Sequence, residues 1–322
     1  MSIMVTTQGG PTFLGIGAPR CGTTWLHWQL SNHPKAWVPP YKELHFFDSN
    51  PDYTSPDTFA IKSPFARLAA FRFWNGNDYL KLRRTLAATL RGDFSAAWWW
   101  WKVLIGYYSD EFYREIFPRD VFSAIGEITP SYSILVPQDI QRIYDVNPDM
   151  KFVFMVRDPI DRIWSALRYN IGRGNLKIDA KDVESMIQHM RDQKGNDAAR
   201  PMRGEYLTTL RNYLKVFPPE NILIGFYDAI QQDPEGLLKD VGEFLGLDPS
   251  GFVSESAVVN ASKVEGQIPE ELRRFLLERE RTLLKGVAEN LGSYACLWSK
   301  EANVDNLYPT IRGDNALLAD LR

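Results

Sequence analysis

Two segments of this sequence combine a short apolar run, a polar turn and a helical pattern in the same order. Lys151 to Val156 is apolar on both faces, as strands buried inside a parallel sheet are. It runs into the turn Arg157-Asp158-Pro159, and proline is well suited to the first turn of a helix. Thr12 to Ala18 is a similar β-rich run, followed by a turn and by the helical pattern of residues 23–30. Both segments predict a strand that leads through a polar loop into a helix.

Further strands and helices are predicted around these two units. Val121 to Ile125 and Ile222 to Tyr227 are strand-like, and apolar residues mark one face of a helix between Arg203 and Phe217. The same helical pattern covers residues 237–245, and one long helix is expected over residues 272–291. Strands that alternate with helices imply a mostly parallel sheet covered on both faces, which binds ligands at the carboxyl ends of its strands. Both polar loops lie at that edge.

The whole chain, residues 1–322, is expected to form one α/β domain with a central parallel β-sheet, since folds of this class reach this length around one core. Residues 51–118 differ from the rest, because they are rich in aromatic residues and lean towards helix. We interpret them as a helical insertion that forms a lid on the acceptor side of the sheet edge. Its aromatic side chains could stack on sugar rings, line a lipid or polyketide channel, or fill the lid's own core. These side chains include Phe71, Phe73, Trp74 and Trp98 to Trp101.

The composition limits where this chain works and what it binds. A net charge of −3 gives no broad attraction to nucleic acid or to an anionic membrane, so an anionic ligand requires a local cluster of basic groups. Only two cysteines occur, and residues 1–10 lack a signal-peptide pattern, which together favour a cytoplasmic location. No stretch approaches the roughly 20 apolar residues of a membrane span. The four histidines lack paired ligand spacing, so no metal site is predicted.

The loop from Gly17 to Thr24 follows a strand and precedes a helix, a context in which backbone N–H groups bind phosphate. It almost fits the loop of nucleoside triphosphatases, in which a lysine and a Ser or Thr follow two glycines. Thr23 stands where that lysine is expected, and the cation of the loop is Arg20. No aspartate that could bind a metal ends the strand at Val156. The loop alone is also compatible with a structural Gly/Pro turn.

The segment from Pro19 to Leu26 (PRCGTTWL) resembles the 5′-phosphosulfate loop of sulfotransferases that use 3′-phosphoadenosine 5′-phosphosulfate (PAPS), usually PKSGTTWL. Arg20 replaces lysine and keeps the positive charge, although its guanidinium is a planar fork. Cys21 replaces serine, and no histidine accompanies it as the base that a catalytic thiol needs. The resemblance implies that the cofactor is bound by Arg20, Cys21, Gly22, Thr23, Thr24 and Trp25.

A second loop, Arg157 to Ser165, resembles the 3′-phosphate site of the same family, in which an arginine and a serine are eight residues apart. Arg157 leaves the end of a strand and Ser165 lies two turns into the next helix, so both can reach one phosphate. The resemblance adds Tyr206, and more weakly Lys263, to the cofactor-binding residues. PAPS carries phosphate groups at both ends of an adenosine, which requires two such loops.

Lys42 to Asp48 (KELHFFD) resembles a segment of the carbohydrate and heparan-type branch, whose glutamate is proposed to deprotonate the acceptor hydroxyl. The matching residue is Glu43, whose pKa we expect the neighbouring phenylalanines to raise by desolvation. His45 is the alternative base, because its ordinary pKa lies nearer neutrality. A surface Lys–Glu pair without a catalytic role is the other interpretation. Gly126 to Tyr132 also resembles this branch, with Ile128 in place of a lysine near the reacting centre.

These resemblances imply a sulfotransferase that moves a sulfuryl group from PAPS to an acceptor hydroxyl by in-line displacement. Glu43 would be the general base, Arg20 would stabilise the departing phosphate, and 3′-phosphoadenosine 5′-phosphate (PAP) would be the product. The acceptor could be a small molecule, a carbohydrate, a lipid or a polyketide. The alternatives are a P-loop nucleotide kinase or triphosphatase, and a nucleotide-binding protein without catalytic activity.

Overall fold

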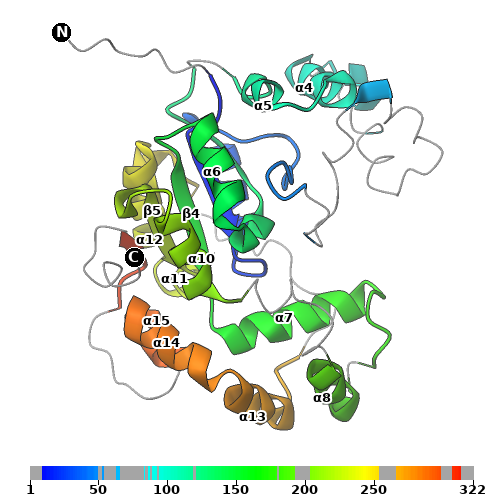
Figure 1. Ribbon diagram of the computed structural model, residues 1–322, viewed down its shortest axis with the longest axis vertical. Helices are drawn as coiled ribbons and strands as arrows, with labels where there is room; N and C mark the ends of the chain where they lie inside the picture. Colours follow the sequence, from blue (N-terminus) through cyan, green and yellow to red (C-terminus); the bar gives the residue numbers. More distant parts are fainter. Residues whose placement is uncertain are drawn as a thin grey trace.

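The fold is built on a six-stranded sheet in the part of the chain that the structure, a computed structural model, describes (Figure 1). The described residues are 9–49, 53, 63–65, 83, 86–87, 89–92, 94–118, 121–179, 181–192, 204–253, 266–298 and 307–312. The strands are β1 (Phe13–Gly17), β2 (Ala36–Trp37), β3 (Ala124–Ile128), β4 (Lys151–Val156), β5 (Ile222–Phe226) and β6 (Thr310–Arg312). Their order is β2-β3-β1-β4-β5-β6, and every pair is parallel except β5 with β6. The predicted α/β class with a mostly parallel sheet is confirmed.

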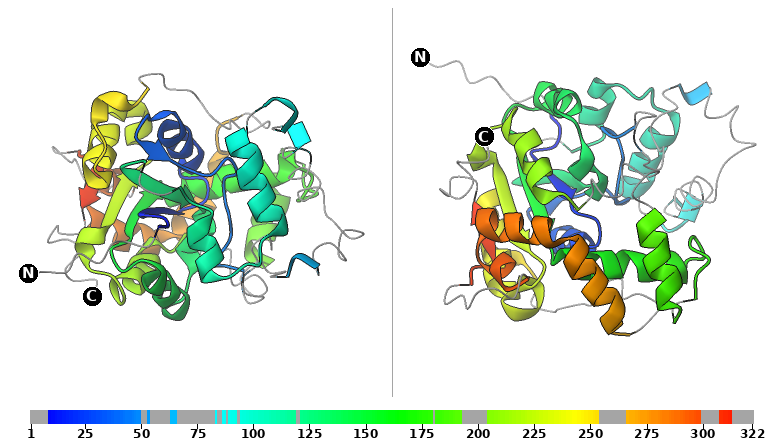
Figure 2. Two further views of the ribbon diagram at one scale, coloured as in Figure 1. Left: turned by 90° about the horizontal axis from the view of Figure 1, so that it is seen from above. Right: turned by 60° about the horizontal axis from the view of Figure 1, so that its bottom comes forward.

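Helices cover both faces of the sheet. They are α1 (Thr23–Asn32), α4 (Phe94–Ile105), α5 (Asp110–Glu115), α6 (Pro137–Val146), α7 (Pro159–Gly172), α8 (Val183–Asp192), α10 (Tyr206–Leu214), α11 (Ala229–Gln232), α12 (Pro234–Leu245), α13 (Glu270–Arg279), α14 (Arg281–Leu291) and α15 (Tyr294–Trp298), with 3₁₀ turns η2 (Pro130–Ile134), η3 (Pro219–Asn221) and η4 (Pro249–Gly251). In the left view of Figure 2, α1 and α12 lie on one face and α6 and α10 on the other. The sheet is therefore shielded from water on both sides, as parallel sheets are.

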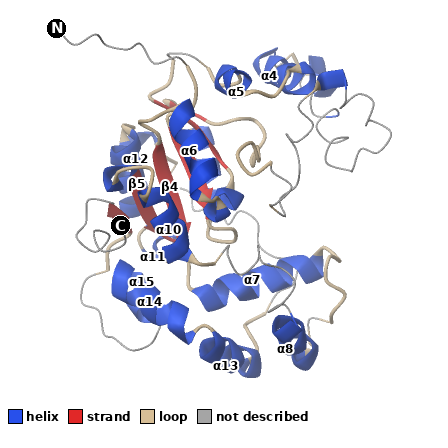
Figure 3. Ribbon diagram, in the orientation of Figure 1, coloured by secondary structure: helices blue, strands red, loops and turns tan. Residues whose placement is uncertain are grey.

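The strand order places β1 and β4 side by side, although about 135 residues separate them in the sequence. From β1 the chain goes out to β2 and returns through β3, and only then crosses β1 to form β4. Helix α7 begins where β4 ends and extends away from the carboxyl edge of the sheet (Figure 3). The order reverses between β1 and β4, and open α/β sheets bind ligands at such a switch point. Both predicted phosphate loops leave the sheet there.

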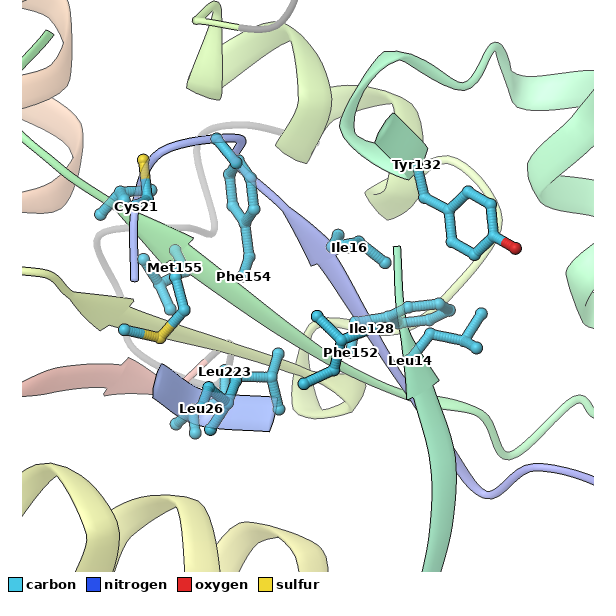
Figure 4. Packing of buried hydrophobic residues seen from close by; sticks show 14 of the residues in the cluster. Leu14, Ile16, Cys21, Leu26, Ile128, Tyr132, Phe152, Phe154, Met155 and Leu223 are labelled. Atoms are coloured by element: carbon cyan, nitrogen blue, oxygen red, sulfur yellow. The ribbon is translucent and has the colours of Figure 1, made fainter. Parts of the chain in front are cut away.

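The core explains why the strands are apolar on both faces. Leu14 and Ile16 of β1, Phe152 and Phe154 of β4, and Leu223 of β5 are all fully buried (Figure 4). Burying a side chain of this size stabilises the fold by roughly 1.5–3 kcal/mol relative to leaving it exposed. The ends of β1 and β4, which carry the loops, are therefore held by packing from both sides.

The strand predicted at Val121 to Ile125 is misplaced by three residues, because β3 starts at Ala124 and ends at Ile128. Val121 is 67% exposed, and the register of β3 with β1 begins at Gly126 opposite Phe13. The strand therefore includes Glu127, a charged residue in the interior of a buried strand.

The single long helix predicted for residues 272–291 is also wrong, because α13 ends at Arg279 and α14 begins at Arg281. The residue between them, Glu280, has φ −96° and ψ 9° and donates its N–H to the Leu276 carbonyl. Residues 278–282 are polar, so no apolar side chain holds this turn against the core and the helix axis can change direction.

Nearly half of the predicted helical insertion lies outside the described residues, including Phe71, Phe73 and Trp74. Its described part contains α4 and α5, in agreement with a helical character. Trp99 and Trp100 are buried and their rings meet edge to face, so these two tryptophans fill a core. Trp98 and Trp101 are exposed. No helix in the described part of the chain combines the length and apolar character that crossing a membrane requires.

Candidate active site

The first loop connects β1 to α1 at the centre of the sheet edge. The N–H of Ala18 donates to the Met155 carbonyl of β4 at 2.6 Å, which ties the loop to its neighbouring strand. Gly22 is the N-cap of α1 with φ 83°, and a Cβ there would lie 2.4 Å from Ile230. Glycine is therefore required both by the backbone and by the space. The ten-residue helix α1 thus begins at this loop, where the positive end of the helix dipole favours an anion.

Arg20 joins the first loop to the second. Its Nε donates to the Ser165 hydroxyl of α7 at 3.1 Å, and its guanidinium lies 4.6 Å from the centre of the Tyr169 ring. In return, Nη1 of Arg157 donates to the Arg20 carbonyl at 3.4 Å, and its guanidinium lies 4.1 Å from the Tyr227 ring centre. Arg20, Arg157 and Ser165, which were predicted separately, therefore form one cluster.

The cluster has an excess of positive charge. Burial lowers the pKa of Arg20, and the charges of Arg157 and Arg168 lower it further, while Tyr169 opposes them. The buried Nε of Arg157 has no acceptor among the residues that the structure describes. A buried donor without an acceptor and repulsion between guanidinium groups both raise the free energy of the protein alone. An anion bound between the two loops would relieve both.

Cys21 and Tyr206 form a buried contact beneath the two loops. The Tyr206 hydroxyl donates to the Arg157 carbonyl at 2.8 Å and lies 3.7 Å from the Cys21 sulfur. Both residues are fully buried. Burial raises the pKa of the Cys21 thiol, so the sulfur is protonated at neutral pH and unsuited to act as a nucleophile. Tyr206 was predicted to bind cofactor, and the contacts that the structure gives it are with the Arg157 backbone of the second loop and the Cys21 side chain of the first.

The other predicted cofactor-binding residues differ in their surroundings. Thr23 and Trp25 on α1 are buried, at 5% and 4% exposure, whereas Thr24 is partly exposed. Lys263 lies outside the described residues. Ser165 is held in place because Asp158 caps α7, its side chain accepting the N–H of Ile160 at 2.7 Å.

The segment with the predicted base lies against the carboxyl end of β3. The N–H of Glu43 donates to the Ile128 carbonyl at 3.2 Å, and the N–H of Leu44 to the Glu127 carboxylate at 3.3 Å. The N–H of Phe46 donates to the Tyr132 hydroxyl at 3.0 Å. Both matched motifs, residues 42–48 and 126–132, therefore belong to one structural unit.

Glu127, which is not among the site residues predicted from the sequence, is the centre of that unit. Its carboxylate is 1% exposed and accepts hydroxyl hydrogen bonds from Thr129 at 2.6 Å and from Tyr113 and Tyr132 at 2.7 Å. Burial raises its pKa, and these hydrogen bonds oppose the shift. A buried carboxylate is retained only when such partners satisfy it. The signal in the sequence was a glutamate inside an otherwise apolar strand.

The candidate base forms a charge network with its neighbours. Lys42 Nζ lies 2.5 Å from Glu43 Oε1, and His45 Nε2 lies 3.7 Å from Glu43 Oε2, while the other ring nitrogen of His45 lies 2.8 Å from Asp48 Oδ2. Burial lowers the pKa of His45, but Asp48 and Glu43 outweigh it and raise the pKa to about 9. His45 is therefore a cation at neutral pH, held between two carboxylates.

The expected rise in the pKa of Glu43 is wrong. Burial does raise it, but the hydrogen bond with His45 and the interactions with Lys42 are stronger together and lower the pKa to about 2. The phenylalanines pack into the core: the Phe46 ring stacks on Tyr113 with centroids 4.2 Å apart, and Phe47 meets the same ring edge to face. The Glu43 side chain itself remains 43% exposed.

Ile128, which replaces a lysine of the resembled motif, is fully buried. A Cβ on Gly15 of β1 would lie 2.7 Å from it, so the two residues pack without a gap. This position contributes no charge to the site. No group of residues that could hold a metal ion occurs in the described ranges.

Comparison with known proteins identifies the family to which this chain belongs. The sequence model described as "Sulfotransferase family" matches residues 11–250, well over half of the chain. The chain belongs to the Sulfotransferase family. The match includes both phosphate-type loops, the Glu43 segment and Glu127.

Several mouse sulfotransferases are similar in sequence to parts of this chain. Heparan sulfate glucosamine 3-O-sulfotransferase 3B1 of Mus musculus is 30% identical over 138 residues, 42% of this chain and 34% of the mouse protein. Carbohydrate sulfotransferase 15 of Mus musculus is 23% identical over 290 residues, 81% of this chain and 48% of that protein. The alignments thus span between a third and a half of these longer relatives.

A solved structure of the family has the same fold. The sulfotransferase from Alicyclobacillus acidocaldarius superimposes with a TM-score of 0.59 at 24% identity, covering 86% of this chain and 94% of its own. The similarity supports the α/β architecture with its mostly parallel sheet.

The charge network in this sulfotransferase-family protein predicts a specific dependence of stability on pH. The pKa of His45 is raised to about 9 in the folded state. The contribution of protonated His45 to the free energy of unfolding is therefore complete below about pH 6.5 and is lost as the pH rises through 9. Asp48→Asn removes the carboxylate that raises this pKa most. We expect wild type to lose on the order of 1–3 kcal/mol more unfolding free energy than the variant between pH 6 and 9.5.

Urea unfolding at several pH values measures this difference. Asp149→Asn removes an exposed carboxylate and is the matched control, which should follow wild type. Parallel pH profiles for wild type and Asp48→Asn would contradict the assignment of a protonated His45.

Proposed function

We propose that this protein transfers a sulfuryl group from PAPS to a hydroxyl group of an acceptor. The observation that carries the proposal is the contact of Arg20 with Ser165, which joins two anion-binding loops at neighbouring strand ends. A nucleotide with negative charge at both its 5′ and 3′ ends fits such a pair of loops. A single phosphate-binding loop would suit many nucleotides.

The residues present fit this donor. The loop from Ala18 to Thr23, at the N-terminus of α1, would hold the 5′-phosphosulfate, and Arg20 adds the only cationic side chain of that loop. Arg157 and Ser165 would hold the 3′-phosphate, and the unpaired Nε of Arg157 is a donor ready to bind it. PAPS supplies the activated sulfuryl group, so the protein has to position the donor and stabilise charge.

Arg20 is placed to stabilise the leaving group. Although its pKa is lowered, the guanidinium remains protonated at neutral pH, because the ordinary value is far above 7. Its hydrogen bond to Ser165 and its contact with Tyr169 hold it in position before the reaction. A charge that is already oriented costs no reorganisation when negative charge develops on the departing phosphate.

Glu43 is the proposed general base. Its carboxylate is ionised at neutral pH and partly exposed, whereas His45 already carries a proton and cannot accept another. A low pKa makes Glu43 a weak base for a free alcohol. The hydroxyl becomes strongly acidic as its oxygen bonds to sulfur, however, so a weak base in contact with it is sufficient. His45 and Asp48 act as positioning residues that orient the carboxylate.

The names of the relatives suggest an acceptor class. The matched mouse proteins are named for heparan sulfate glucosamine and for carbohydrate, so a carbohydrate hydroxyl is the first acceptor to test here. Ile128 supplies no cation near Glu43. We therefore expect a neutral or weakly charged acceptor to be preferred over a highly sulfated one.

Radiolabelled PAPS and a panel of hydroxyl-bearing acceptors test the function directly. We expect labelled product and PAP to form together, in equal amounts and only with acceptor present. Magnesium-dependent hydrolysis of ATP with PAPS untouched would instead indicate a P-loop kinase or triphosphatase. Binding of PAP without transfer to any acceptor would indicate a nucleotide-binding protein without catalytic activity.

Replacement of the base gives the second test. Glu43→Gln preserves shape and removes basicity, so turnover should fall by about 10² or more while the affinity for PAP stays within about twofold. Glu278→Gln, an exposed glutamate on α13, is the matched control and should leave turnover unchanged. Near-normal turnover of Glu43→Gln would refute the role of Glu43.

A further inference from the structure

Arg168 lies on the same side of α7 as the residues that meet the first loop. It follows Ser165 by three positions and precedes Tyr169, and residues three or four apart in a helix share a face. Ser165 and Tyr169 are the two residues of α7 that contact Arg20. Arg168 is therefore next to the cluster of Arg20 and Arg157, and the sequence analysis did not include it.

Two contacts fix the position of the Arg168 side chain. Its guanidinium lies 5.4 Å from the centre of the Trp164 ring, and its Nη1 donates to the Gly266 carbonyl at 3.4 Å. The indole N–H of Trp164 donates to the same carbonyl at 3.3 Å. Arg168 is half-buried. Its charge is thus held at one place and does not move freely in solvent.

The charge of Arg168 repels the charges of Arg157 and Arg20. Burial lowers the pKa of Arg168 and the charge of Arg157 lowers it further, with partial compensation from Asp161. The charge of Arg168 in turn lowers the pKa of Arg20. Three guanidinium groups that repel one another in a chain of net charge −3 form a local site for a multiply charged anion.

We propose that Arg168 is a specificity-determining residue that recognises the 3′-phosphate of the nucleotide together with Arg157 and Ser165. The proposal rests on the proposed function. A phosphate monoester on the ribose carries close to two negative charges, whereas a 3′-hydroxyl carries none. A second guanidinium beside Arg157 therefore increases the preference for nucleotides with a 3′-phosphate, and contributes little to the binding of those without one.

Calorimetric titration with PAP and with AMP, which lacks the 3′-phosphate, tests this role. For wild type we expect PAP to bind much more tightly than AMP. Arg168→Gln should weaken PAP binding by about tenfold, the scale of one lost hydrogen bond between charged groups, and change AMP binding less than twofold. Arg168→Lys keeps the charge and should recover part of the loss. Lys177→Gln removes an exposed charge just beyond α7 and is the matched control.

The possible outcomes are distinct. Equal loss of PAP and AMP affinity in Arg168→Gln, or no loss of either, would overturn the role of Arg168 while wild type still prefers PAP. If wild type itself binds PAP and AMP equally, the assignment of the donor fails and the role of Arg168 fails with it. The melting temperatures of the variants show whether a loss of PAP affinity comes from unfolding. If Arg168→Gln is less stable than wild type, recovery of PAP affinity in Arg168→Lys, without a change in AMP affinity, supports the proposal.

Discussion

The parallel pairing of β1 with β4 is the constraint on which the rest of this protein depends. It brings together two loops that are far apart in the sequence, and the hydrogen bond from Ala18 to Met155 extends the pairing into the first loop. Arg20 can reach Ser165 only because α7 starts beside α1 at that edge. The positive cluster is thus a consequence of topology, with the apolar core holding both strand ends in place.

A second constraint places the candidate base. Glu127 brings a carboxylate into the interior of the sheet, where its burial would be costly without hydrogen-bond partners. Three hydroxyl groups and the N–H of Leu44 satisfy it, and through Leu44 it also anchors the segment of Glu43 and His45. The proposed catalytic carboxylate is therefore oriented by a buried one. The two carboxylates have opposite pKa shifts because burial dominates at Glu127 and neighbouring cations dominate at Glu43.

The sequence allowed the strands and loops of the site to be predicted, but not the pKa values of the site residues. The strands at residues 151–156 and 13–17 and the two loops could be recognised because apolar runs and turn residues are local signals. The pKa of Glu43 could not, because it is lowered by the hydrogen bond with His45 and the interactions with Lys42, and these depend on side-chain geometry that the sequence does not show. Glu127 and Arg168 were missed because some of their partners, such as Leu44 for Glu127 and Gly266 for Arg168, come from distant segments. The edge strand β6 is too short to give a pattern.

A crystal structure with PAP bound tests the central claim most directly. The account predicts the 5′-phosphate at the N-terminus of α1, within hydrogen-bond distance of Arg20 and the loop N–H groups, and the 3′-phosphate between Arg157 and Ser165. Binding of PAP in the reverse orientation, or away from the edge shared by β1 and β4, would contradict it.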